Sequence, residues 1–123
     1  MSIVAELPPF AGVGRSVDEY EFRGRVASFG EVRVDLARME LVRKGVEVQL
    51  TATEFKLLAF LLQNPKRVIS RKELLDAIWG YHADLVTRTV DIHISKLRQK
   101  LERDPANPIH VRTVHCAGYE FVP

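Results

Sequence analysis

The spacing of the apolar residues changes at Thr51, and this change constrains the fold more than any other feature of the chain. Before Thr51, apolar and polar residues alternate in four short stretches, at residues 26–29, 32–35, 40–43 and 46–50. Such alternation between turn residues is typical of antiparallel strands. After Thr51, apolar residues recur at every third or fourth position, which is typical of helices. We therefore predict an α+β fold in which a four-stranded antiparallel sheet precedes the helices.

Two capping-box patterns predict where the first two helices begin. Thr51 is followed three residues later by Glu54, and Ser70 is followed by Glu73, so each pair can satisfy free backbone amides at a helix start. One face of the first helix then carries Phe55, Leu58, Ala59 and Leu62, and Asn64-Pro65 ends it. The second helix is expected to end at Gly80, and Val68-Ile69 forms an extended link between the two helices.

A third helix and a hairpin complete the predicted fold. Thr87 is a candidate N-cap, and the helix is expected to end before Asp104-Pro105. Its buried stripe consists of Val90, Ile94, Leu97 and Leu101, at spacings of four, three and four residues. Residues 109–114 and 119–122 form a C-terminal β-hairpin in which Gly118 supplies a positive φ. Three helices followed by a hairpin predict a winged helix-turn-helix.

The face of the third helix opposite its buried stripe is predominantly basic and polar. It carries Arg88, Thr89, Ile92, Ser95, Lys96, Gln99 and Arg103, with Asp91 and Arg98 on one flank. Ile92 lies near the centre of this face, where a soluble helix gains nothing from an apolar side chain. On a solvated helix, Ile92 would be a scattered exposed apolar residue. In a DNA major groove, it would contact a thymine methyl group while the polar residues read base edges.

Length and composition limit the other possibilities. The 123 residues and 46% hydrophobic content allow one domain, at residues 26–123, and the Pro- and Gly-containing residues 1–25 are predicted to be a linker or a weakly ordered tail. The first residues lack the pattern of a signal peptide and no apolar run is long enough for a membrane helix, so we expect the chain to be cytoplasmic. A net charge of +2 is too small to indicate a nucleic-acid partner by itself.

No pattern for catalysis or metal binding appears. The single cysteine, Cys116, cannot form an internal disulfide, and His93 has no second ligand one helical turn away, so we expect no metal or cofactor. His115 and Cys116 are adjacent on a predicted strand and would point to opposite faces, so they cannot act as a base and a nucleophile. The chain is not expected to be an enzyme.

The chain resembles the C-terminal output domain of OmpR/PhoB-type response regulators. The resemblance is carried by LTATEFKLLAFLLQNPKRVISRKELLDAIWGY, then TRTVDIHISKLRQKLE, then VRTV and YEF around the hairpin tip, and by FGEVRVD and VEVQL in the predicted sheet. It implies a winged helix-turn-helix that binds tandem promoter sites in double-stranded DNA as head-to-tail pairs, through residues 87–103 and 109–122. It also implies a receiver domain, whose phosphorylation by a cognate histidine kinase favours pairing and which is absent from this chain.

The resemblance also assigns roles to individual residues. On the recognition helix, the positions facing DNA are Arg88, Thr89, Asp91, Ile92, Ser95, Lys96 and Arg98. Phosphate-contacting positions are Arg71, Trp79 and Thr113, and a wing position that is arginine in relatives is His115. The segment that touches RNA polymerase in relatives matches Tyr81, His82, Ala83, Asp84, Leu85 and Val86. The alternative function is a winged helix that binds proteins without specific DNA binding, which the salt dependence of DNA binding would distinguish.

Overall fold

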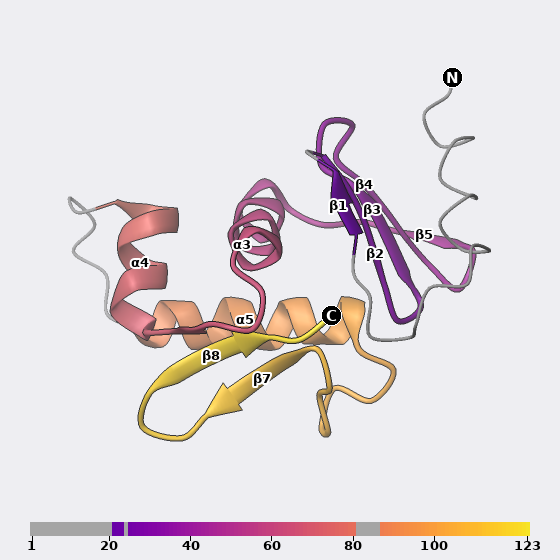
Figure 1. Cartoon of the computed structure of the whole chain (residues 1–123). Helices are drawn as coiled ribbons and strands as arrows, with labels where there is room; N and C mark the ends of the chain where they lie inside the picture. Colours follow the sequence, from indigo (N-terminus) through magenta and orange to yellow (C-terminus); the bar gives the residue numbers. More distant parts are fainter. Residues whose placement is uncertain (1–20, 24, 81–86) are drawn as a thin grey trace.

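A computed structural model of the chain describes residues 21–23, 25–80 and 87–123. Two antiparallel sheets lie on either side of three helices (Figure 1). The N-terminal sheet contains β1 (Glu21–Arg23), β2 (Val26–Phe29), β3 (Val32–Asp35), β4 (Glu40–Arg43) and β5 (Val46–Val48). The helices are α3 (Ala52–Gln63), α4 (Arg71–Trp79) and α5 (Arg88–Leu101), and the C-terminal sheet contains β6 (Val68–Ile69), β7 (Val111–Val114) and β8 (Gly118–Phe121). The predicted α+β winged helix-turn-helix is confirmed.

The N-terminal sheet has one strand more than we predicted. The four predicted strands are present, and β1 pairs with β2 through Phe22 and Ala27. Because β1 is only three residues long, it shows no alternation that would separate it from the predicted tail. The face that packs against the helices carries Ala27, Phe29, Val32, Val34 and Leu41, all of them buried. The sheet therefore begins before Val26, inside the segment that we assigned to the tail.

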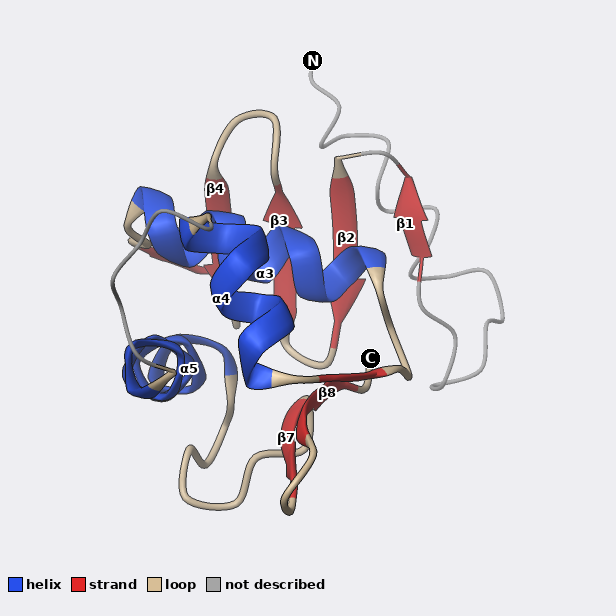
Figure 2. Ribbon diagram, turned by 90° about the vertical axis from the view of Figure 1, so that its left-hand side faces the viewer, coloured by secondary structure: helices blue, strands red, loops and turns tan. Residues whose placement is uncertain are grey.

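The helix α3 begins with the predicted capping box. The Thr51 hydroxyl accepts a hydrogen bond from the Glu54 amide at 3.1 Å, and the Glu54 carboxylate accepts one from the Thr51 amide at 2.9 Å. The buried residues include the predicted Phe55, Leu58 and Leu62, and also Leu57 and Leu61. The helix is buried on more than one side because it lies between the N-terminal sheet and the other two helices (Figure 2).

The starts of α4 and α5 differ from the prediction. The Ser70 hydroxyl accepts from the Glu73 amide at 3.0 Å, but the Glu73 carboxylate pairs with Arg67 at 2.9 Å, so only half of the second capping box is present. The prediction that Thr87 caps α5 through its side chain is wrong. Thr87 has helical backbone angles, with φ −60° and ψ −17°, and its hydroxyl caps no amide. The predicted buried stripe of α5 is confirmed in full.

The C-terminal hairpin belongs to a three-stranded sheet in the order β6-β8-β7. The segment Val68-Ile69, which we predicted to be an extended link, pairs with β8. Gly118 has the predicted positive φ, at +143°, and Cys116 at the hairpin tip also has a positive φ, at +64°. The ring of Phe121 packs edge-on against Phe29 with centroids 4.9 Å apart, which joins this sheet to the N-terminal sheet. No helix among the described residues is long and apolar enough to cross a membrane.

Candidate nucleic-acid interface

The helix α5, which we predicted to be the recognition helix, has neighbours on three of its four sides. In Figure 2, α5 is seen nearly end-on, with α3 and α4 above it and the hairpin to its lower right. The buried stripe Val90, Ile94, Leu97 and Leu101 packs into the core between these elements. The remaining polar side chains divide into two flanks and one open face, and this division determines which of them are available to a partner.

One flank of α5, here called the wing flank, contacts the β7–β8 hairpin, here called the wing. It consists of Asp91, Arg98 and Glu102, whose spacings of seven and four residues place them in one narrow stripe. Arg98 donates from Nε to the Val111 carbonyl at 2.9 Å and from Nη2 to the Thr113 hydroxyl at 2.8 Å. Its guanidinium also lies 5.4 Å from the centroid of the Tyr119 ring. Arg98 and Thr113, both predicted to face DNA, therefore bind each other.

Glu102 attaches the start of the wing to the end of α5. Its carboxylate accepts backbone hydrogen bonds from Ile109 at 2.9 Å, His110 at 3.0 Å and Val111 at 2.8 Å. The side chain is only 1% exposed, so these bonds replace the water that a buried carboxylate requires. Glu102 was not among the predicted site residues. Its position four residues after Arg98 on the wing flank is the signal that could have identified it.

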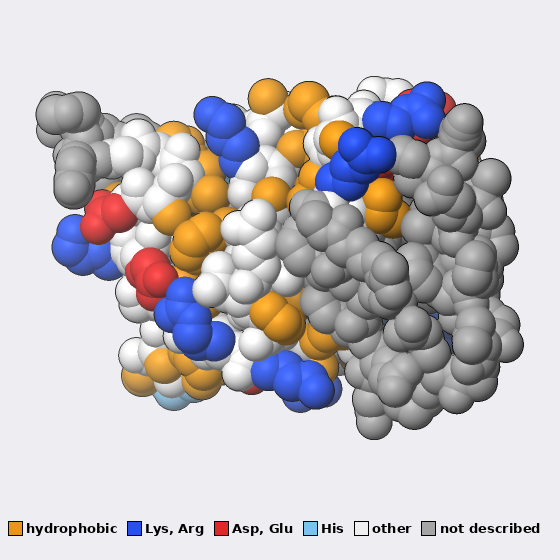
Figure 3. Space-filling view, turned by 45° about the horizontal axis from the view of Figure 1, so that its top comes forward, with side chains coloured by type: hydrophobic (Ala, Val, Ile, Leu, Met, Phe, Trp, Pro, Cys, Tyr) orange, Lys and Arg blue, Asp and Glu red, His pale blue; other side chains and the backbone are white. Residues whose placement is uncertain are grey.

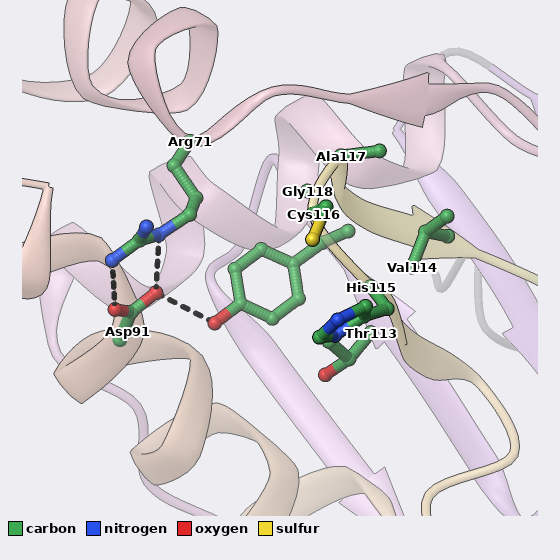
Figure 4. A pocket seen from close by; sticks show the side chains of 9 residues that line it. Arg71, Asp91, Thr113, Val114, His115, Cys116, Ala117 and Gly118 are labelled. Carbon is green, nitrogen blue, oxygen red and sulfur yellow. Dashed lines mark hydrogen bonds and ion pairs between the residues drawn. The ribbon is translucent and has the colours of Figure 1, made fainter.

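Asp91 joins α5 to both α4 and the wing. Its carboxylate accepts from Nε of Arg71 at 3.0 Å, from Nη2 of Arg71, and from the Tyr119 hydroxyl at 2.7 Å (Figure 4). Burial raises the pKa of Asp91, but the bonds from Arg71 and Tyr119 outweigh burial, and the net pKa is lowered. Burial, together with the bond to Asp91, raises the pKa of Tyr119 to about 12. At neutral pH the carboxylate is therefore ionised and the phenol is protonated.

The opposite flank of α5 faces α3 and α4 and carries His93 and Lys100. The His93 ring packs edge-on against Trp79 with centroids 5.0 Å apart, and its Nδ1 lies 2.9 Å from the Thr89 carbonyl. Lys100 pairs with the buried Glu54 at 2.7 Å. Trp79, a predicted phosphate contact, is half-buried against the core. No group of His, Cys, Asp and Glu side chains in the described part of the chain could hold a metal ion.

The remaining side of α5, here called the solvent face, is open. It carries Arg88, Ile92, Ser95, Lys96 and Gln99, all exposed, and the predicted exposure of Ile92 is confirmed at 47%. Among the described residues, none of the polar side chains on this face has a hydrogen-bond or ion-pair partner. Thr89, also predicted to face DNA, is half-buried at the edge of this face. The solvent face therefore offers two cations, two polar groups and one aliphatic group to a partner.

A hollow of about 300 Å³ lies between the wing tip, the start of α4 and α5 (Figure 4). The predicted site residues Arg71, Asp91, Thr113 and His115 all line it, and Tyr119 lines it as well. His115 is exposed at the wing tip. The structure thus brings two of the three predicted phosphate contacts, Arg71 of α4 and Thr113 of the wing, to one place beside α5, whereas Trp79 lies outside this hollow. The predicted RNA polymerase segment, residues 81–86, lies outside the described residues.

The charges on another side of the molecule are mixed. Figure 3 shows the top of the view in Figure 1, where basic, acidic and apolar side chains lie next to one another on the described part of the surface. On α4, Lys72 pairs with Asp76 at 3.1 Å, and Glu73 pairs with Arg67 at 2.9 Å. These lysine and arginine charges are paired within the protein, whereas neither Arg88 nor Lys96 on the solvent face forms an ion pair within 4 Å among the described residues. The charge of Arg88 acts on Asp91 only at longer range, where it helps to lower the pKa of that carboxyl.

Comparison with known proteins identifies similar sequences and folds. The family model described as the C-terminal part of transcriptional regulatory proteins matches residues 45–121. The sensory transduction protein RegX3 of Mycobacterium tuberculosis is 42% identical over 106 residues, which cover 85% of this chain and 46% of that protein. The response regulator MtrA of Mycolicibacterium smegmatis is 41% identical over 96 residues, which cover 78% of this chain and 42% of that protein. The chain thus spans about half the length of the curated relatives that it matches.

Two solved structures support the same comparison. The response regulator DrrB of Thermotoga maritima, an OmpR/PhoB homologue, matches with a TM-score of 0.73 and 30% identity, over 80% of this chain and 44% of that one. The DNA-binding domain of RstA from Klebsiella pneumoniae, solved in complex with the RstA box, matches with a TM-score of 0.70 and 31% identity. That match covers 79% of this chain and 96% of the RstA domain.

Proposed function

The chain belongs to the OmpR/PhoB family of C-terminal DNA-binding domains of transcriptional regulatory proteins, and from this premise we propose that it binds tandem promoter sites in double-stranded DNA through α5 and the wing. The observation that carries the proposal is the solvent face of α5. It holds two cations that form no ion pair among the described residues, two polar groups and an exposed isoleucine, on a helix whose other three sides pack against the rest of the domain. This family consists of DNA-binding regulators rather than enzymes, and the proposal includes no catalytic step.

The solvent face has the dimensions and chemistry for reading a major groove. From Arg88 to Gln99 the helix rises about 16 Å, which corresponds to about five base pairs at 3.4 Å each. Lys96 can donate to guanine O6 and N7, and Ser95 and Gln99 can bond to other base edges. Ile92, between them, can contact a thymine methyl group. We assign base reading to this face, with Arg88 and Thr89 at its N-terminal end.

Phosphate contacts come from the elements beside α5. Arg71 is the first residue of α4, where free amides and the helix dipole favour a phosphate. Thr113 lines the same hollow from the wing, and His115 at the wing tip would approach the minor groove. Trp79 at the end of α4 can donate its indole N–H to a second phosphate. These contacts position the protein on DNA without selecting a base sequence.

The proposed partners follow from the part of the relatives that lies outside the matched segment. RegX3 and MtrA are about twice as long as the matched segment, and a phosphorylated receiver domain with its cognate histidine kinase is our proposal for how binding is regulated. Two copies would pair head-to-tail on tandem sites. RNA polymerase would contact the segment at residues 81–86.

Selection from a pool of random DNA duplexes tests the proposal. We expect the 123-residue chain to recover a repeated motif with a spacing near one helical turn. Lys96→Ala and Ile92→Ala should each relax the preference at one base pair, by about 1–3 kcal/mol for Lys96. Lys56→Ala, at an exposed position of α3, is the matched control and should change nothing. Recovery of no motif, together with DNA binding that is insensitive to salt, would favour a protein-binding winged helix instead.

A further inference from the structure

Three elements of the proposed DNA interface meet at one carboxylate, that of Asp91. The carboxylate oxygen Oδ1 accepts from Arg71 of α4 and from Tyr119 of β8, and Oδ2 accepts from Arg71 alone. An aspartate that reads a base does so by accepting from the amino group of cytosine. Asp91 instead lies on the wing flank, half-buried, with both oxygens already bonded. Its geometry therefore differs from that of the residues on the solvent face.

The bonds to Asp91 fix the orientation of Arg71. A guanidinium is planar and has five N–H donors, of which Asp91 takes those on the edge formed by Nε and Nη2. No partner in the described part of the chain takes Nη1, and the Arg71 side chain is 46% exposed. The guanidinium is therefore held by one edge while its other edge remains free at the N-terminus of α4. That free edge is where a DNA phosphate would bind.

Tyr119 connects the same carboxylate to the wing. Its ring is buried beneath the Arg98 guanidinium, so its hydroxyl reaches Asp91 from a fixed position in β8. The bond of 2.7 Å between Tyr119 and Asp91 holds the wing beside the first turn of α5, and Glu102 holds it beside the last turn. The distance between the recognition helix and the wing is set at both ends of α5.

We propose that Asp91 is a positioning residue for DNA binding, which aims Arg71 at a phosphate and holds the wing against α5, and that it does not read a base. The inference rests on the proposed function, because it concerns how that interface is arranged. It narrows base reading to the solvent face. It also predicts that changes at Asp91 act on all DNA sequences alike, because a phosphate contact and the wing position carry little sequence information.

The test uses the 123-residue chain and the duplex recovered from the random pool, together with duplexes in which each base pair of that motif is replaced in turn. Asp91→Asn, which keeps the shape of the side chain and removes its charge, should weaken binding about tenfold on every duplex and leave the order of preference unchanged. Arg71→Ala should weaken binding similarly. In the Arg71→Ala background, Asp91→Asn should add less than about a twofold further loss, since residues that act through one another are not additive.

Two further variants test whether Asp91 positions its neighbours or reads a base. Tyr119→Phe removes one hydroxyl and leaves both charges, and it should lower affinity in the same uniform way by a smaller factor. Lys96→Ala is the contrasting variant and should relax the preference at one base pair. A partly unfolded sample would also lose affinity on every duplex alike, so the active fraction of each variant is titrated first and its affinities are corrected for that fraction. A uniform loss that remains after this correction supports positioning, and no remaining loss contradicts it.

The inference is overturned if Asp91→Asn changes the preference at one base pair while binding to the other duplexes is retained. It is also overturned if the losses from Asp91→Asn and Arg71→Ala multiply. If the wild-type chain recovers no motif at all, the proposed function fails and the inference fails with it. If the wild type recovers a motif and only the Asp91 results disagree, the proposed function stands without this inference.

Discussion

A Cβ atom on Gly118 would lie 2.0 Å from the carbonyl oxygen of Ile69. This close approach brings β8 against β6 directly before Ser70, the residue that caps α4. Gly118 also has φ +143°, a backbone conformation that side chains other than hydrogen rarely adopt. The base of the wing is thus attached to the start of the helix-turn-helix at a position that only glycine can occupy.

We predict that Gly118→Ala lowers the free energy of unfolding by about 2–4 kcal/mol, because the methyl group meets backbone that cannot move independently. Urea denaturation measures the change. The matched control is Gly45→Ala, where φ is +79° but a Cβ would meet no atom within 4 Å. This control should lose only about 1–2 kcal/mol from its conformation. Equal losses in the two variants would show that the approach to Ile69 is unimportant.

Replacing Lys100 should lower the free energy of unfolding more than replacing Glu54, although the two residues form one ion pair. Glu54 is 1% exposed, while the Lys100 side chain is 30% exposed. Lys100→Met would leave a buried carboxylate without its cation and should cost about 3–5 kcal/mol. Glu54→Gln keeps an acceptor for the Thr51 amide and leaves a lysine that can reach water, so it should cost about 1–2 kcal/mol. Thermal or urea unfolding of both variants measures these losses. A larger loss in Glu54→Gln than in Lys100→Met would contradict the prediction.

Glu102 is expected to hold the start of the wing through its three backbone acceptor contacts. Glu102→Gln removes the charge and turns an amide group toward backbone N–H donors, and it should destabilise the chain by about 1.5–3 kcal/mol. Amide hydrogen exchange should accelerate at residues 109–111 in particular. Glu47→Gln changes an exposed carboxylate of β5 that has no hydrogen-bond or ion-pair partner among the described residues, and it should have an effect below about 0.5 kcal/mol. Unchanged exchange at residues 109–111 in Glu102→Gln would contradict this role.

The stability of the chain should decrease above about pH 10 because of Tyr119. The pKa of Tyr119 is raised from 10.0 to about 12, so the folded chain holds this proton more tightly than the unfolded chain does. The resulting stabilisation is complete below about pH 10 and is lost as the pH rises through about 12. Tyr119→Phe should remove this part of the decline when urea unfolding is measured at several pH values. Other tyrosines and lysines titrate in both proteins, so the difference between the two profiles is the diagnostic quantity. Identical profiles would mean that Tyr119 ionises normally.

The local features of this fold could be read from the sequence. The capping box at Thr51 and Glu54, the buried stripe of α5, the exposure of Ile92 and the positive φ of Gly118 all depend on residues within a few positions of one another. Their physical causes, helical periodicity and backbone sterics, act at short range. The motif resemblance extended the prediction to the correct family. The resemblance did not predict the short strand β1, because its three residues are too few to show an alternation of apolar and polar positions.

The partners of the polar residues were decided only by the tertiary structure. Helical periodicity placed Asp91 and Arg98 on one flank of α5, but it could not indicate that the wing would lie against that flank. Their bonds to Tyr119, Val111 and Thr113 cross 13 to 28 residues of chain, so no local pattern encodes them. The failed prediction for Thr87 has a similar cause. Its side chain is of a type that caps helices, but its backbone angles are already helical and its hydroxyl caps no amide. The sequence by itself determined the elements and their faces. Packing decided which face of α5 stayed exposed, because the exposure of a face depends on where elements distant in the chain come to lie.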